Sequence, residues 1–89
     1  MTQEEIRAAV IDLVVSIAPE IDVATLRGDA SLREQVELDS VDVMSYVTGL
    51  SKRFALRIPE RDYPHLFRLD ACVRYLAQRL AHRDAVGSR

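Results

Sequence analysis

The stretch Glu37-Leu38-Asp39-Ser40-Val41-Asp42, near the middle of the chain, determines where the central helix begins. Asp39 is a suitable N-cap, because its carboxylate can accept hydrogen bonds from the free N–H groups of a first helical turn. Asp42 follows three residues later, completes a capping-box pattern, and places negative charge where the helix dipole favours it. Ser40 then takes the first helical position, where its hydroxyl points outward and a phosphate group would be stabilised.

The helix predicted from this start runs from Ser40 to about Phe54. Its apolar positions recur at helical spacing and predict one buried stripe: Val43, Tyr46, Val47, Leu50 and Phe54. Three further residues, Val41, Met44 and Thr48, share a different face, on the same side as the Ser40 hydroxyl. They either pad the edge of the core or form a small exposed patch, and the spacing leaves both interpretations open.

Two more long helices are expected. Thr2-Gln3-Glu4-Glu5 is typical of a capping box, and Pro19 ends the helix that this box opens. The other helix is expected from Leu69 to about Ala81, with Asp70 as its candidate cap. The buried stripes predicted for these two helices are Ile6, Val10, Leu13, Val14 and Ile17, and Leu69, Cys72, Val73, Leu76 and Leu80.

The connections between the long helices differ in kind. From 20 to 39 no long periodicity appears, and we expect an ordered loop with short turns, including a brief helical turn capped by Ser31. Scattered apolar residues should hold this loop in place; they are Ile21, Val23, Leu26, Leu32 and Val36. After Ile58, Pro59 suits the first position of a short helix, which Pro64 limits to a turn or two. Its expected inward residues are Tyr63, Leu66 and Phe67.

These elements predict an all-α fold, a small antiparallel helical bundle with three main helices and one short helix. The 89 residues are enough for one domain, which we expect to span 1–89 with a core of about 2–82 and a disordered tail at 83–89.

Composition excludes several classes of protein. The net charge of −2 argues against a nucleic-acid partner, which would require a basic surface. The single cysteine allows no internal disulfide and is consistent with a reducing compartment. The acidic N-terminus lacks the pattern of a signal peptide, and no apolar run is long enough to span a membrane. We therefore expect a cytoplasmic monomer with no membrane partner.

The central stretch resembles a known motif. Leu38-Asp39-Ser40-Val41-Asp42 is similar to the attachment motif of the acyl and peptidyl carrier proteins. Asp29-Ala30-Ser31-Leu32 lies upstream of it, as a similar stretch does in that family. Further matching residues follow without gaps; they are Phe54, Ile58-Pro59, Asp62-Tyr63, Leu69-Asp70 and Tyr75-Leu76. The resemblance covers roughly Thr2 to Ala81.

This resemblance implies a function. In the family, the motif serine carries 4′-phosphopantetheine, taken from coenzyme A by a phosphopantetheinyl transferase, and the thiol of this arm holds an acyl group. Ser40 is then the attachment residue, and Asp39, Val41 and Asp42 are its neighbours in the cofactor site. Val41, Met44 and Thr48 become candidate contacts for acyl-loading and acyl-processing enzymes. The protein would itself catalyse no reaction.

Two departures from the family bear on the pathway. In fatty-acid carriers the central helix is markedly acidic, whereas here Asp42 is its only acid and Lys52 and Arg53 close it. Glu37 also stands where the family commonly has glycine. Both differences disfavour housekeeping fatty-acid synthesis and favour a dedicated pathway, fatty-acid-like, polyketide, peptidyl or otherwise specialised.

Other interpretations remain open. Ser40 could be unmodified, in which case the chain would be a small helical protein-interaction module, or it could be a kinase target. An enzyme is a third possibility, with no catalytic set to support it. His65 and His82 lack metal-ligand spacing, so we expect no metal. Cys72 lies on an apolar stripe and is expected to be a buried structural thiol.

Overall fold

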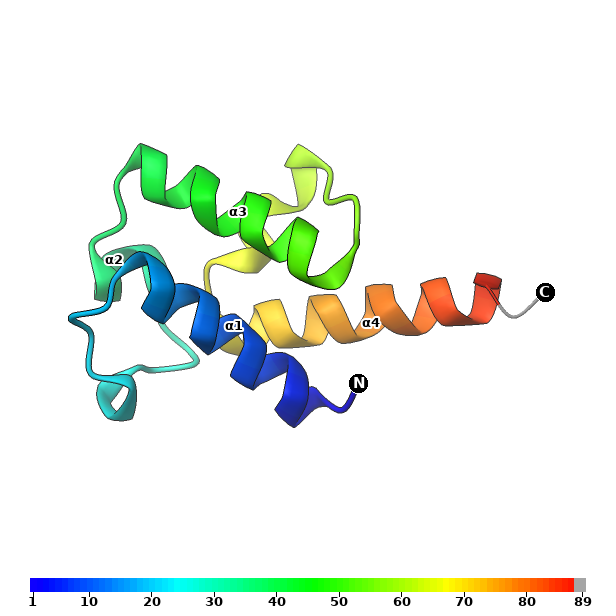
Figure 1. The fold of residues 1–89 in the computed structure, drawn as a ribbon, viewed down its shortest axis with the longest axis horizontal. Coiled ribbons are helices and arrows are strands. Elements are labelled where there is room, and N and C mark those ends of the chain that lie inside the picture. Colours follow the sequence, from blue (N-terminus) through cyan, green and yellow to red (C-terminus); the bar gives the residue numbers. More distant parts are fainter. Residues whose placement is uncertain (88–89) are drawn as a thin grey trace.

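Three long helices make up most of the computed structural model, which describes the backbone of residues 1–87 and the side chains of residues 1–82. They are α1 (Gln3–Ile17), α3 (Ser40–Phe54) and α4 (Leu69–Gly87). In Figure 1, α1 runs in the opposite sense to α3 and α4, and the three enclose the core between them. The predicted all-α bundle is confirmed. None of the helices in the described part of the chain is both long and apolar enough to cross a membrane.

The first helix begins as the sequence predicts. The Thr2 hydroxyl accepts from the Glu5 N–H at 3.1 Å, and the Glu5 carboxylate accepts from the Thr2 N–H at 2.8 Å. These reciprocal bonds satisfy two N–H groups that a helix cannot satisfy internally. The pKa of the Glu5 carboxyl is lowered, because hydrogen bonding to the Thr2 backbone, and then to the Thr2 side chain, favours its charged form.

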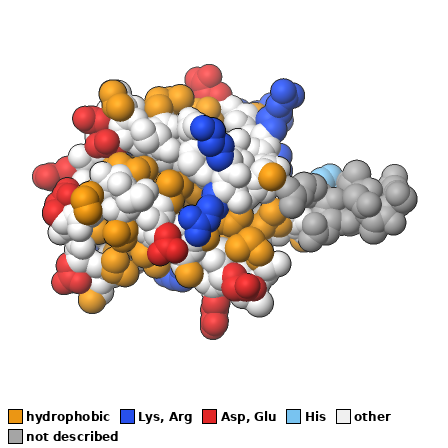
Figure 2. Space-filling model, in the orientation of Figure 1, with side chains coloured by type: hydrophobic (Ala, Val, Ile, Leu, Met, Phe, Trp, Pro, Cys, Tyr) orange, Lys and Arg blue, Asp and Glu red, His pale blue; other side chains and the backbone are white. Residues whose placement is uncertain are grey.

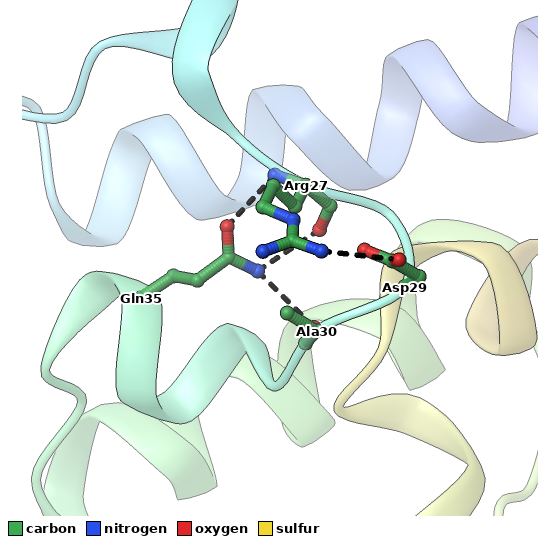
Figure 3. Close-up of polar contacts among 4 residues, drawn as sticks. All are labelled: Arg27, Asp29, Ala30 and Gln35. Carbon is green, nitrogen blue, oxygen red and sulfur yellow. Dashed lines mark hydrogen bonds and ion pairs between the residues drawn. The ribbon is translucent and has the colours of Figure 1, made fainter.

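The connection from α1 to α3 is held by caps and by one polar side chain. Asp22 caps the short helix η1 (Val23–Thr25), and Ser31 caps α2 (Leu32–Val36) as predicted. The Gln35 amide reaches back to the loop, accepting from the Arg27 N–H at 2.7 Å and donating to the Arg27 carbonyl at 2.9 Å (Figure 3).

The expectation that the scattered apolar residues hold this loop is partly right. Leu32 and Val36 are buried, and Ile21 and Leu26 pack against the core, but Val23 is 43% exposed. The side chain of Gln35 also donates to the Ala30 carbonyl at 3.1 Å (Figure 3), so the loop closes on itself through an amide. This closure satisfies backbone groups that the loop would otherwise leave to water.

The short helix η2 (Glu60–Leu66) follows α3 and contains Pro64. Pro59 is its N-cap and not its first residue, so that prediction was one position off. Of the expected inward residues, Leu66 is fully buried, whereas Tyr63 and Phe67 are partly buried. The Tyr75 hydroxyl donates to the Asp62 carboxylate at 2.7 Å and ties η2 to α4.

The helix α4 starts at Leu69, as predicted, but it ends later than expected. Asp70 pairs with the Arg7 guanidinium at 2.9 Å, and its own N–H donates to the Gly28 carbonyl at 3.0 Å, so its carboxylate links α4 to α1. The helix continues to Gly87 and does not end near Ala81, because no glycine or proline interrupts it before that point. The tail predicted at 83–89 stays a prediction. The side chains of 83–87, and residues 88 and 89 as a whole, lie outside the described part of the chain.

The predicted stripes form the core. Ile6, Val10 and Val14 of α1 meet Tyr46 and Leu50 of α3, together with residues of α4 such as Leu69, Cys72 and Leu76. Burying each large aliphatic side chain contributes roughly 1.5–3 kcal/mol. Stripe residues at the flanks are only partly buried, because three helices leave the stripe edges uncovered; they are Leu13, Ile17, Val43 and Leu80.

Candidate functional site

The N-terminus of α3 is closed by the capping box that the sequence predicts. Asp39 Oδ1 accepts from the Asp42 N–H at 2.8 Å, and Asp42 Oδ2 accepts from the Asp39 N–H at 3.3 Å. Asp39 has extended backbone angles, so the helix begins at Ser40. Both carboxylates are therefore engaged with the backbone, and they fix the position of the first helical turn.

Ser40 is exposed at this rigid helix start. The chain enters through Leu38, which is buried, and the Leu38 N–H donates to the Arg33 carbonyl at 3.1 Å. Because the first N–H groups of a helix have no partner within it, the end of α3 carries partial positive charge. A negatively charged group on the Ser40 oxygen would be favoured there while remaining in solvent.

A shallow groove of about 670 Å³ starts at Ser40 and follows the outer face of α3. It is lined by Ser40, Val41, Met44, Ser45, Thr48, Gly49 and Lys52. Val41 is 73% exposed and Met44 is 53% exposed, and Thr48 is exposed as well. Figure 2 shows hydrophobic side chains at the surface above α3, along the upper edge of the view. The structure thus places the three residues in an exposed patch and not in the core.

Comparisons with known proteins agree in the family that they indicate. A protein of Amoebophilus asiaticus named acyl carrier protein is 29% identical over 82 residues, 89% of this chain and 98% of the relative. A protein of the same name from Renibacterium salmoninarum is 28% identical over 79 residues, 85% of this chain and 93% of the relative. No protein-family model matches the chain.

A solved structure decides the question. The solution structure of a protein from Anaplasma phagocytophilum, assigned as an acyl carrier protein, superposes with a TM-score of 0.76 and 31% identity. The match covers 88% of this chain and 91% of that one. The chain belongs to the acyl carrier protein family. The resemblance seen in the sequence is thereby confirmed.

One departure of this carrier from its family now has a structural setting. Glu37, which stands where the family commonly has glycine, ends α2 in a left-handed conformation with φ of 56°. Glycine adopts this conformation without steric cost, whereas a side chain is strained there. The carrier keeps the left-handed turn that leads into Leu38 and Ser40, but the Glu37 backbone is strained there.

The remaining candidate residues of the carrier lie away from Ser40. Cys72 is fully buried, and burial raises the pKa of its thiol to about 11, so the thiol stays protonated and unreactive at neutral pH. His65 stacks on the Tyr75 ring with centroids 5.8 Å apart, and His82 is exposed. Among the side chains that the structure describes, no three His, Cys, Asp or Glu residues are grouped to hold a metal.

Sequence reasoning did not anticipate the role of Gly49. A Cβ at this position would come within 2.6 Å of Leu13 Cδ1, so the missing side chain lets α1 pack closely on α3. Gly49 also lines the far half of the groove, where it presents only its backbone. A glycine inside a helical pattern often marks a close approach of this kind, but the partner element cannot be named from the pattern.

Proposed function

We propose that this protein carries acyl or aminoacyl intermediates as thioesters on a 4′-phosphopantetheine arm attached to Ser40. The observation that supports the proposal is the exposed Ser40 hydroxyl at the capped, rigid start of α3 in a chain of the acyl carrier protein family. The terminal thiol of the arm supplies the acyl-carrying chemistry. The protein's own residues position the arm and present it, and we infer no catalytic activity of the chain itself.

The residues around Ser40 suit this group. The phosphodiester would be anionic and would lie at the positive end of α3, where helix N–H groups and the dipole favour it. The Asp39 and Asp42 carboxylates are turned to the backbone of the cap, so their hydrogen-bonding capacity is directed into the helix. Val41 extends into solvent beside the attachment point, where an enzyme bound at Ser40 would contact it.

The attachment reaction requires a phosphopantetheinyl transferase and coenzyme A. The Ser40 Oγ would attack the phosphorus that bears the pantetheine chain, forming the new P–O bond as the bond to adenosine 3′,5′-bisphosphate breaks. The serine proton would pass to a base on the transferase, since the Ser40 side chain has no hydrogen bond to any general base among the described residues. This carrier contributes a fixed, exposed hydroxyl and the cap that holds it.

Acyl-loading and acyl-processing enzymes are the expected partners, and we propose Val41, Met44 and Thr48 as their contact residues. These side chains are exposed, largely apolar and line the groove that starts at Ser40. Among the described residues, the only cation that lines their groove is Lys52, in the last turn of α3. Like charges across an interface penalise association, so a partner with a basic docking surface would be disfavoured. This supports a polyketide or specialised pathway over housekeeping fatty-acid synthesis.

We further propose a monomer acting in the cytoplasm, with no nucleic-acid or membrane partner. The net charge of −2 supports the first exclusion, because a nucleic-acid-binding surface would be basic.

The test is an intact-mass measurement. Wild-type protein incubated with coenzyme A and a broad-specificity phosphopantetheinyl transferase should gain the mass of one phosphopantetheine group, and Ser40→Ala should gain none. Ser45→Ala, one turn further along the same helix, is the matched control and should be modified like the wild type. An unchanged wild-type mass would contradict the proposal and favour a protein-interaction module with an unmodified Ser40.

A further inference from the structure

The groove on α3 follows the geometry of helix side-chain rows. Residues four apart form inclined ridges on a helix, and here one ridge is Ser40, Met44, Thr48 and Lys52. The neighbouring ridge, Val41, Ser45 and Gly49, lines the other side of the channel, and Gly49 presents only its backbone there. From Ser40 to Lys52 the channel extends roughly 18 Å along the axis of α3, at a helical rise of about 1.5 Å per residue.

The chemistry of the lining changes along this channel. Close to Ser40 it is apolar, with Val41 and Met44. One turn later it presents the hydroxyl groups of Ser45 and Thr48, each able to donate and to accept a hydrogen bond. The far end presents the backbone of Gly49 and an ammonium group from Lys52.

A phosphopantetheine arm carries matching groups in the same order. Beyond the phosphate come two methyl groups on one carbon, then two amides, then the thiol. We propose that the arm on Ser40, when no partner has taken it up, lies in the α3 groove with its methyl groups on Met44, its amides beside Ser45 and Thr48, and its sulfur end toward Lys52. This inference rests on the proposed attachment at Ser40.

Because the arm would be tethered at Ser40, weak binding to the groove is sufficient to hold it there. A group held by a short flexible linker experiences an effective concentration in the millimolar range at sites within reach. Millimolar affinity between arm and groove would therefore give about half occupancy. Because Val41, Met44 and Thr48 are also the proposed partner contacts, an enzyme that covers them displaces the arm from the groove and makes its thiol available.

The direct test compares NMR spectra of the apo and the loaded protein, each confirmed by intact mass. In the loaded protein, amide and methyl shifts should change along the groove as far as Lys52, including the methyl groups of Met44 and Thr48. Nuclear Overhauser effects should connect the arm's methyl groups to the Met44 methyl. Shift changes confined to residues 39–42, with no such effects, would overturn the inference while leaving attachment at Ser40 intact.

A variant that fills the groove provides the second test. Ser45→Gln places a longer side chain in the channel and should abolish the arm-dependent shifts at Thr48 and Lys52. Loading should still add the mass of one phosphopantetheine group to this variant. Arg74→Gln, an exposed substitution on α4, is the matched control and should retain them. Loss of these shifts in both variants, or in neither, would contradict a role for the groove. Absence of any added mass would overturn both the attachment and this inference.

Discussion

The hydroxyl of Tyr46 donates a hydrogen bond of 2.7 Å to the backbone carbonyl of Leu66. Both residues are fully buried, so this bond joins α3 to η2 inside the core. Tyr46→Phe would leave the carbonyl without its donor, and we expect the free energy of unfolding to fall by about 1–3 kcal/mol. Urea denaturation measures the change. Tyr63→Phe, whose hydroxyl has no hydrogen bond among the described residues, should have a much smaller effect, and equal losses would refute the explanation.

Relieving the strained turn before Ser40 should increase the free energy of unfolding. Glu37 has φ of 56°, a conformation that costs a residue with a side chain about 1–2 kcal/mol. Glu37→Gly removes this strain. The glycine also raises the conformational entropy of the unfolded chain, which offsets part of the gain. We therefore expect a net stabilisation of about 0.5–1 kcal/mol. The same exchange at Glu34, inside α2, should destabilise the protein. If both glycines destabilise equally in thermal and urea denaturation, the left-handed turn is not a source of strain.

The buried thiol should make stability depend on alkaline pH. The pKa of Cys72 rises from 9.0 to about 11 through burial. Above about pH 9 the unfolded chain loses this proton while the folded chain retains it, so the free energy of unfolding decreases as pH rises toward 11. Between about pH 8 and about pH 10.5 the loss due to Cys72 should be about 2 kcal/mol.

The control for this pH effect is Cys72→Ala. Burial also raises the pKa of Tyr46, and the neighbouring Cys72 thiol raises it further, so Tyr46 adds to the loss above pH 10 more in the wild type than in the variant. The alanine variant should therefore lose less stability than the wild type over the same range, although it is less stable at pH 8. Parallel stability curves for the two proteins would show that the thiol is not the group responsible.

The cap of α3 should be needed for both stability and modification. Asp39→Ala removes the acceptor of the Asp42 N–H and should cost about 1 kcal/mol in urea denaturation. It should also slow loading by the transferase, because the first turn that carries Ser40 would fray. Asp29→Ala, which removes only an exposed ion pair with Arg27, should stay within about 0.5 kcal/mol and load normally. Equal behaviour of the two variants would deny Asp39 its capping role.

The sequence predicted those elements whose causes are local. The capping boxes at Thr2 and Asp39 and the apolar repeats after them lie within a few residues of one another, and they placed the start of α1 and both ends of α3 correctly. The position of Ser40 follows from the same local rules. Its exposure also requires that no other element covers the start of α3, and only the tertiary structure shows that.

Features that depend on distant partners could not be predicted. The Gln35 amide is hydrogen-bonded to Arg27, eight residues away. The Asp70 carboxylate accepts a hydrogen bond from Arg7, 63 residues away in the sequence. No periodicity encodes such pairs. The close approach of Leu13 to Gly49 is likewise a contact between two helices, and their relative position emerges only on packing. The extension of α4 to Gly87 was also missed: the helix was predicted to end near Ala81, just after Leu80, the last residue of its predicted stripe.

The most direct test of the account is to locate the modification within the chain. After incubation with coenzyme A and a phosphopantetheinyl transferase, trypsin should release the peptide between Arg33 and Lys52, which contains Ser40, Ser45 and Ser51. Fragmentation of this peptide in a tandem mass spectrometer distinguishes the three serines. We predict a single phosphopantetheine group on Ser40. A peptide that remains unmodified, or one that carries the group on Ser45 or Ser51, would contradict the central claim.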